Sequence, residues 1–302
     1  RKTDPVEYLM QVITCVGFCG LFKDADGNVT SRAVVIPYEG EENYKLIKAL
    51  CATSTPKVLQ NGKYDIIHLT TNNIAIENYR FDTYGMMHSW YAELPRTLDF
   101  ISSFTLKNSM YWKDESSKDL YGYNAKDTHA TLWACVSLLQ QMPDWAVANF
   151  GENFIQIFPC ITCALEGFAV DWNEFEGKKQ KLQEEIDNSL AAAEFVFGKG
   201  FNPNSPIQVK KVLNIFGLPS AESSDKKNLQ KFKDLSSFTD VLASYITNYR
   251  KASKVHSTYF EFPFLGDRWL FDLDPFGTET GRYASKASSL WVGQQGQNFP
   301  AI

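Results

Sequence analysis

The stretch KVLQNGKYDIIHLTTNN (57–73) changes from a short apolar run to a polar turn and then to a segment with helical spacing. KVLQ predicts a short strand, and Asn61, Tyr64 and Asp65 follow this strand and open a helix. Because α/β proteins place their sites at the carboxyl ends of strands, the next helix would hold Asp65 at such an end. An Asp near a helix start is more often a cap than a site residue, so Asp65 needs a companion before it indicates chemistry.

The residues before this stretch predict a hairpin and a helix. QVITCVGFCGLF (11–22) is a β-branched apolar run, DADGN (24–28) carries the Asp-Gly turn signal, and SRAVVIPY (31–38) is a second apolar run. ENYKLIKALCAT (42–53) has apolar residues at helical spacing. With residues 57–73 this order predicts a βαβ arrangement, in which helices cover a sheet.

Helices are expected to dominate the rest of the chain. The segments after Asp82 are expected to be mostly helical, and from about Asp171 we expect helices alone. Residues 171–198 begin at a capping residue, repeat apolar residues on one face and stop at a glycine. Residues 237–260 predict another long helix, with a basic C-terminal half.

Two further segments are expected to be irregular or extended. AESSDKKNLQKFKD (221–234) is polar enough to favour a mobile loop. YFEFPFLGDRWLF (259–271) has aromatic residues at period two followed by Gly-Asp, which favours a strand and a turn.

The composition excludes several classes of protein. A chain of 302 residues with 44% apolar residues has ample core material for two domains, so a disordered or fibrous chain is excluded. No apolar run approaches the length of a membrane span, and RKTDPVEYLM (1–10) lacks the order of a signal peptide. We therefore expect a soluble, cytoplasmic protein without a membrane partner. The six cysteines lie mostly in apolar segments, which is typical of buried reduced thiols.

The net charge of −5 argues against a uniformly basic nucleic-acid binder, but the average conceals a gradient. Between Val209 and Phe260, nine Lys and Arg residues outnumber the Asp and Glu residues. This uneven distribution of charge along the chain is compatible with a local basic surface on a protein whose net charge is negative.

A companion for Asp65 lies in YNAKDTHATLW (123–133). Tyr123 and Asp127 are four residues apart at a helical start, so their side chains project from one face. Two Asp residues from different segments and a phenol suit two-metal hydrolysis of a phosphodiester, because carboxylates hold divalent ions and the ions generate hydroxide.

The motifs resemble those of the proofreading 3′–5′ exonuclease domain of family A DNA polymerases. NGKYD is similar to the second exonuclease motif of that family and YNAKD to the third, and RFDT (80–83) lies where the family has a similar segment. NPNSPIQVKKVLNIFGLP (202–219) and YRKASKVHSTYF (249–260) resemble parts of the polymerase thumb. TETGRYASKASSLWVGQQGQNFPAI (278–302) resembles the family's TGR…QN run, with Phe299 in place of the usual aliphatic residue.

The resemblance implies a fold and a domain order. The fold would be α/β, an RNase H-like exonuclease domain with an incomplete sheet, followed by an all-α thumb lobe. Residues 1–165 would be the exonuclease domain without its first strand, 166–265 the thumb, and 266–302 the start of the palm. The protein would be a phage-like DNA polymerase portion, located in the host cytoplasm.

The resemblance also implies site residues and partners. In the complete enzyme Asp65 and Asp127 would bind two Mg²⁺ ions, and Tyr123 would orient the attacking water. The thumb and the C-terminal run would grip primer-template DNA through phosphates and minor-groove acceptors. The implied DNA-binding residues are Asn61, Arg250, Lys251, Lys254, Thr280, Arg282, Ser285, Lys286, Gln297 and Asn298.

The sequence departs from the family pattern at both ends. The first exonuclease motif, Asp-x-Glu, is missing, because Asp4 and Glu7 are three residues apart with no apolar run before them. The palm and fingers would begin just after Ile302. We therefore expect a fragment of a larger polymerase, or one piece of a split enzyme completed by other chains, that neither polymerises nor proofreads alone.

Two alternatives stay open. One is a stand-alone RNase D-like exoribonuclease, which would have no use for the thumb and TGR…QN segments. The other is a non-enzymatic DNA-binding subunit or degenerate exonuclease that serves as a clamp.

Overall fold

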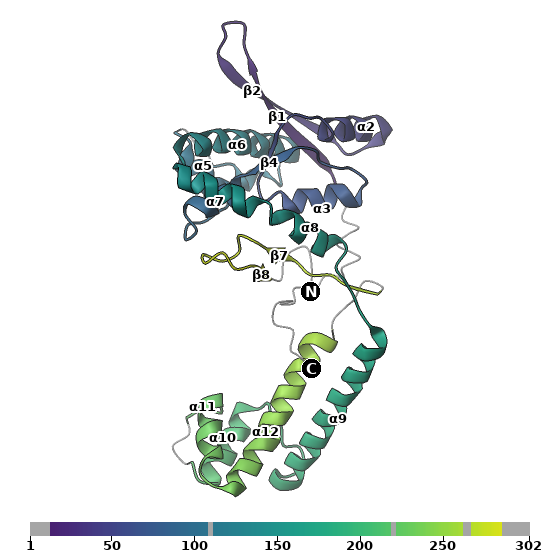
Figure 1. The fold of residues 1–302 in the computed structure, drawn as a ribbon, viewed down its shortest axis with the longest axis vertical. Coiled ribbons are helices and arrows are strands. Elements are labelled where there is room, and N and C mark those ends of the chain that lie inside the picture. The colour runs from purple at the N-terminus through teal and green to yellow at the C-terminus, as the bar shows by residue number, and fades with distance from the viewer. Residues whose placement is uncertain (1–12, 108–110, 219–221, 262–266, 286–302) are drawn as a thin grey trace. The chain divides into compact units, whose positions relative to one another are not determined.

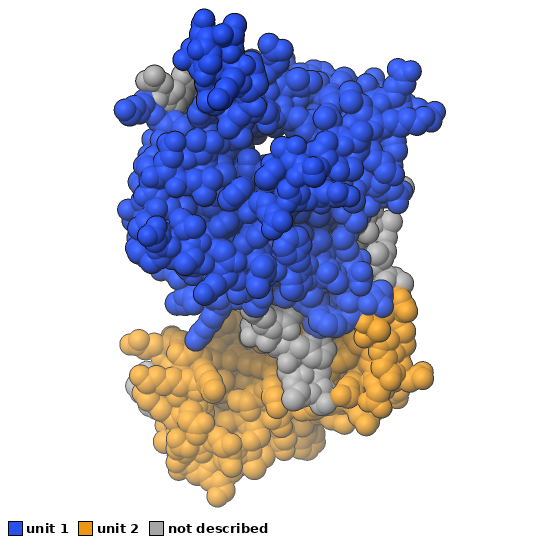
Figure 2. Space-filling view, turned by 45° about the horizontal axis from the view of Figure 1, so that its top comes forward, with its two compact units in different colours: residues 1–168, 268–297 blue, residues 169–267, 298–302 orange. Residues whose placement is uncertain are grey.

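The chain divides into two compact units. The structure, a computed structural model, describes residues 13–107, 111–218, 222–261 and 267–285. Unit 1 comprises residues 1–168 and 268–297, and unit 2 comprises residues 169–267 and 298–302 (Figure 2). Each unit has its own buried core, so each is described by itself.

Unit 1 begins with the predicted hairpin, which the structure confirms. β1 (Cys15–Lys23) pairs antiparallel with β2 (Val29–Pro37) over nine residues each. The turn between them is fixed by Asp24, whose carboxylate accepts the backbone N–H groups of Asp26 and Asn28 at 3.0 and 2.8 Å. Gly27 supplies the positive φ of 81° that the turn requires. Figure 1 shows the hairpin extending beyond the helices that pack at its base.

The helix and the strand predicted after the hairpin both form, but the predicted βαβ arrangement was wrong in its pairing: among the described residues the strand at 57–59 shares no sheet with the hairpin and pairs instead with a later strand. After α2 (Gly40–Cys51), β3 (Lys57–Leu59) runs parallel to β4 (Tyr79–Asp82), and α3 (Lys63–Thr71) connects them. Ile47 and Ile74, both fully buried, join a core shared by β2, α2 and α3. Among the described residues the β1–β2 and β3–β4 ladders are separate two-stranded sheets.

Helices form most of the rest of unit 1 after β4, as predicted. They pack around β3 and the hairpin base, with α6 against β1, β2 and β3. Asp119 caps α6 by accepting the Gly122 N–H at 2.9 Å. The elements are α4 (Thr83–Trp90), α5 (Leu98–Thr105), the short 3₁₀ helix η1 (Lys113–Glu115), α6 (Leu120–Gln141), α7 (Asp144–Phe154), α8 (Ile157–Leu165) and β5 (Phe168–Ala169).

Residues 268–285 return to unit 1 and pack on its helices. β7 (Leu273–Asp274) and β8 (Ala284–Ser285) pair antiparallel beside α8, after the short β6 (Arg268–Trp269) (Figure 1). Phe276 is 2% exposed and fills a socket on α4. The socket exists because Gly85 has no side chain: a Cβ there would come within 2.7 Å of the Phe276 ring.

Unit 2 consists mainly of helices, with α9 (Trp172–Phe197) and α12 (Ser237–Val255) side by side (Figure 1). The predicted limits of α9 are confirmed: Asp171 accepts the first free N–H groups, and the helix ends at Gly198, whose φ is 102°. α10 (Pro206–Ile215) and α11 (Lys226–Lys233) complete the lobe. The core is formed by Ala193, Phe201, Val209, Val212, Leu213, Leu229, Phe232, Leu242, Ala243 and Ile246.

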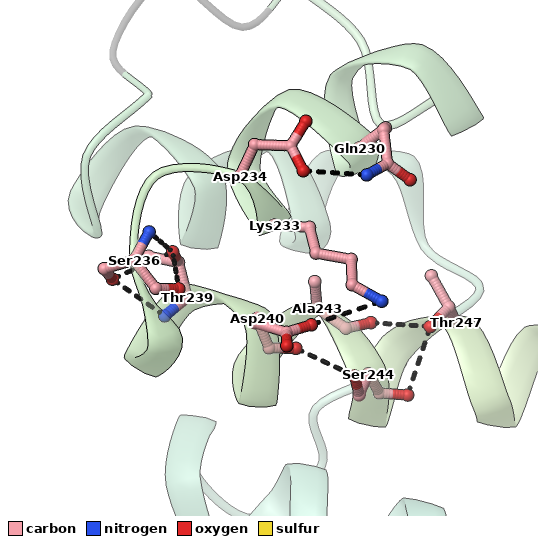
Figure 3. A network of polar contacts seen from close by, with 9 residues as sticks. All are labelled: Gln230, Lys233, Asp234, Ser236, Thr239, Asp240, Ala243, Ser244 and Thr247. Carbon is pink, nitrogen blue, oxygen red and sulfur yellow. Dashed lines mark hydrogen bonds and ion pairs between the residues drawn. The ribbon is translucent and has the colours of Figure 1, made fainter.

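The expectation of a mobile loop over residues 221–234 was wrong for its second half. α11 forms there because Asp225 caps its start, accepting the Asn228 N–H at 2.8 Å, and because Leu229 and Phe232 are buried. Figure 3 shows how α11 joins α12: Lys233 forms an ion pair with Asp240 at 3.2 Å.

The expectation of a strand in residues 259–271 was wrong for the start of that segment, residues 259–261, whereas the short β6 does form at its far end. Residues 256–260 form one π-helical turn, η2 (His256–Phe260), that continues α12, and Phe260 packs against Phe175 of α9 with 4.8 Å between the ring centroids. Packing on α9 therefore outweighs the period-two pattern. No helix in the described part of the chain is long and apolar enough to cross a membrane.

Candidate functional site

The turn between β3 and α3 is fastened to a buried carboxylate, that of Asp82. The backbone N–H groups of Asn61 and Gly62 donate to Asp82 at 3.1 and 2.8 Å. The backbone of Asn61 has a φ of 54°, in the left-handed region, and in this conformation both N–H groups point to the Asp82 carboxylate. The Asn61 side chain is exposed. The start of α3, and with it Asp65, is thereby held at the carboxyl ends of β3 and β4.

Asp82 itself is a structural residue. It is 2% exposed, caps α4 by accepting the Tyr84 N–H at 2.9 Å, and also accepts the Tyr79 hydroxyl. Burial raises its pKa, although the hydrogen bonds lower it in part. The sequence reasoning noted the RFDT segment but missed this role. Its local signal is an Asp directly between a strand and a helix.

The structure brings Asp65 and Asp127 into one electrostatic environment. Asp65 is half-buried on the first turn of α3. Burial, with smaller contributions from the negative charges of Asp82 and Asp127, raises the pKa of Asp65 to about 7. Asp65 and Asp127 come from segments more than 60 residues apart, and the negative charge of Asp127 acts on Asp65.

Tyr123 and Asp127 lie one turn apart on α6 and share a cation, Lys113. The Lys113 ammonium donates to Asp127 Oδ1 at 2.6 Å and to the Tyr123 hydroxyl at 3.1 Å. The Trp112 indole N–H donates to the same Asp127 oxygen at 2.6 Å. Burial opposes the charged form of Lys113, but the hydrogen bond and charge of Asp127 outweigh it, so the pKa of Lys113 is raised. Sequence reasoning missed Lys113 and Trp112.

The residues that the structure describes do not assemble a two-ion site. They contain no group of three or more His, Cys, Asp or Glu side chains placed to hold a metal ion. Asp65 and Asp127 are two carboxylates, the second is already paired with Lys113, and Asp82 is occupied by backbone donors. Asp4 and Glu7 lie outside the described residues.

The C-terminal segment is anchored beside the candidate site. Lys63, on the first turn of α3, forms an ion pair with Asp272 and donates to the Leu273 carbonyl at 2.7 Å. Tyr84 of α4 donates to Asp274 at 2.9 Å. Further along, Arg96 donates to the Phe276 carbonyl at 2.7 Å. These contacts hold residues 272–276 against the helices that follow β3 and β4.

The predicted DNA-binding residues of this segment differ in exposure. Thr280 and Arg282 are exposed, and an open cleft of about 550 Å³ is lined by residues 92–96 and 277–280. Ser285 is buried in β8, paired with Leu273, so its side chain is not displayed for a ligand. The other three predicted residues, Lys286, Gln297 and Asn298, lie outside the described part of the chain.

On α12 the predicted basic residues separate into two roles. Arg250 is committed to the lobe, because its guanidinium donates to the carbonyls of Pro203 at 2.7 Å and Ser224 at 2.6 Å and to the Ser224 hydroxyl at 3.1 Å. Arg250 thereby ties α12 to the turn before α10 and to the segment before α11, and its contact with phosphate stays a prediction. Lys251 and Lys254 are exposed at helical spacing.

Comparison with known proteins gives a fold relationship. No family model matches the sequence, and no curated protein matches it. Among solved structures, the POL domain of Pol1 from M. smegmatis, in complex with DNA primer-template and dNTP, is similar. The match has a TM-score of 0.70 and 16% sequence identity, and it covers 98% of this chain and 53% of that chain. The chain thus has a polymerase-like fold and spans about half the length of that domain.

Proposed function

We propose that this chain is the exonuclease-like and thumb-like portion of a family A DNA polymerase, and that unit 2 binds primer-template duplex. The observation that carries the proposal is the fold match over 98% of the chain to a polymerase domain bound to primer-template. The order of the motifs along the sequence supports it, since NGKYD, YNAKD, the thumb segment and the TGR run follow one another as in that family.

Duplex binding is assigned to the exposed lysines of α12. Lys251 and Lys254 lie in the last turns of the helix, and both are exposed. Ammonium groups contact phosphates, which are the same for every sequence, and this suits an enzyme that copies any template. Arg250 contributes indirectly, by fixing the end of α12 on which these lysines stand.

Unit 1 is assigned the carboxylates of a proofreading site that other segments complete. Asp65 and Asp127 supply two of its acidic groups, and a first strand carrying Asp-x-Glu would supply the others. Among the described residues β1–β2 and β3–β4 are separate two-stranded ladders, and we propose that such a strand joins them into one sheet. Because the described residues do not complete the ion site, we assign no hydrolytic step to this chain alone. The palm and fingers would be further partners, in the same or another chain.

A second candidate function is a DNA-binding subunit without nuclease activity. The ion pair between Lys113 and Asp127 favours it, because a carboxylate already neutralised by an ammonium is a weaker ligand for a divalent ion. Both candidates predict binding of duplex by α12, and they differ in whether added segments restore metal-dependent degradation.

The duplex assignment is tested by fluorescence anisotropy with a labelled primer-template at several KCl concentrations. Each lost phosphate contact lowers the slope of log affinity against log salt by about 0.9. Lys251→Gln/Lys254→Gln should therefore bind more weakly at low salt, with a slope smaller by about 1.8. A matched variant, Lys23→Gln/Lys45→Gln, removes the same charge from exposed lysines of unit 1 and should change the slope much less. Equal slopes for the two variants would contradict the assignment.

A further inference from the structure

Lys113 is placed with its ammonium against one of the candidate carboxylates, that of Asp127. It opens the short helix η1, and its ammonium lies 5.2 Å from the centre of the Trp112 ring and 5.0 Å from that of Tyr123. Its side chain is 23% exposed and that of Asp127 is 29% exposed. Two aromatic faces and a carboxylate therefore surround one cation, an arrangement that lowers the solvation of the pair and strengthens its attraction.

The neighbouring lysine provides a contrast. Lys126 precedes Asp127 on α6, but its ammonium pairs with Glu115 on the outside of the helix, where both side chains are about half exposed. Lys113 alone of these two touches Asp127. The donors on Asp127 Oδ1, from Lys113 and Trp112, leave Oδ2 without a hydrogen bond from either residue.

We propose that the Lys113 ammonium is the resident cation of this site and competes with a divalent ion for Asp127. The inference rests on the proposed assignment of Asp65 and Asp127 to an exonuclease-like site. An ammonium and a divalent cation repel one another, and both are drawn to the same carboxylate, so Lys113 weakens the binding of the ion. Lys113 is a positioning residue, because it also fixes Tyr123 and Asp127 relative to one another.

The test is a titration of the full chain with Mn²⁺ alone, followed by electron paramagnetic resonance of the free ion. Lys113→Met keeps most of the side-chain stem over the aromatic rings and removes the charge, so it should bind Mn²⁺ at least about tenfold more tightly than the natural chain, or about 1.4 kcal/mol. Lys113→Arg keeps the charge and should bind as the natural chain does. Lys126→Met removes an equal charge next to Asp127 without touching it and should change the affinity less than about threefold.

The outcomes separate clearly. A gain in Lys113→Met that Asp127→Asn abolishes in the double variant supports the proposal. Equal gains in Lys113→Met and Lys126→Met, weaker binding by Lys113→Met, or no binding by it would each overturn the proposal. Thermal melting shows whether each variant folds, and Lys113→Gln, a second variant without the charge, should show the same gain in Mn²⁺ affinity as Lys113→Met. The duplex assignment is measured on α12, so either proposal can fail without the other.

Discussion

The Lys63 ammonium and the Asp272 carboxylate form an ion pair in which both side chains are more than nine-tenths buried. The two residues are 209 positions apart, and Lys63 lies two residues before Asp65. The ion pair therefore joins the C-terminal segment to the helix that carries a candidate site carboxylate. Its removal should affect both the stability of unit 1 and the placement of α3.

Lys63→Met should destabilise unit 1 by about 3 kcal/mol, because it leaves the buried Asp272 carboxylate without its partner. Lys63→Met/Asp272→Leu removes both charges and should be less destabilised than the single variant. Urea unfolding gives the free energies. Lys45→Met breaks the exposed pair with Glu41 and should cost less than about 1 kcal/mol. Equal losses in the buried and exposed variants would contradict a buried, paired Lys63.

Gly85→Ala should destabilise unit 1 by about 1 to 3 kcal/mol, since the new methyl group would overlap the Phe276 ring. Gly151→Ala provides the matched control. Gly151 lies inside α7 with open space around it, so alanine there should stabilise the helix by up to about 1 kcal/mol. Thermal denaturation compares the two. Opposite signs are expected, and a stabilised Gly85→Ala variant would show that Phe276 does not occupy this socket.

The elements with local signals could be predicted from the sequence. The Asp-Gly turn predicted the hairpin, and the strand–turn–helix pattern placed Asp65 on the first turn of α3. The limits of α9 followed from its capping Asp171 and terminal Gly198. In each case a few adjacent residues determine the turn or the end of the helix, so the element could be predicted without knowledge of any tertiary contact.

The missed features depend on contacts between distant residues. No local pattern pairs Lys63 with Asp272, or marks Arg250 as a structural residue, because their partners come from other segments. Lys113 is 14 residues from Asp127, and their contact depends on how the chain folds back between η1 and α6. α11 was missed because its composition is polar, and its signals were few: a capping Asp225 and two apolar residues one turn apart.

Phe232→Ala tests whether α11 is a packed helix. Phe232 is fully buried in the core of unit 2, so the truncation should cost about 3 to 5 kcal/mol and expose the amide groups of α11 to exchange. Lys231→Ala, an exposed neighbour on the same helix, should be within about 0.5 kcal/mol of the natural chain. Hydrogen exchange with mass spectrometry measures the protection. Fast exchange of the α11 amide groups in the natural chain itself would show that this segment is a mobile loop and not a packed helix.

Asp65 couples the stability of unit 1 to pH. Its folded-state pKa of about 7 lies above the ordinary value, so the stabilisation it gives is fully present below that ordinary value and is lost as the pH rises through 7. Asp65→Asn does not titrate at this position, so it lacks this loss of stability. Its free energy of unfolding, relative to that of the natural chain, should therefore increase as the pH rises from about 4 to about 8. The gain is at most about 1.4 kcal/mol per unit of pKa shift, and smaller because Asp65 keeps some contact with solvent. Urea unfolding across this range measures the difference, and a difference that does not change with pH would mean that Asp65 is not held in a buried, acidic environment.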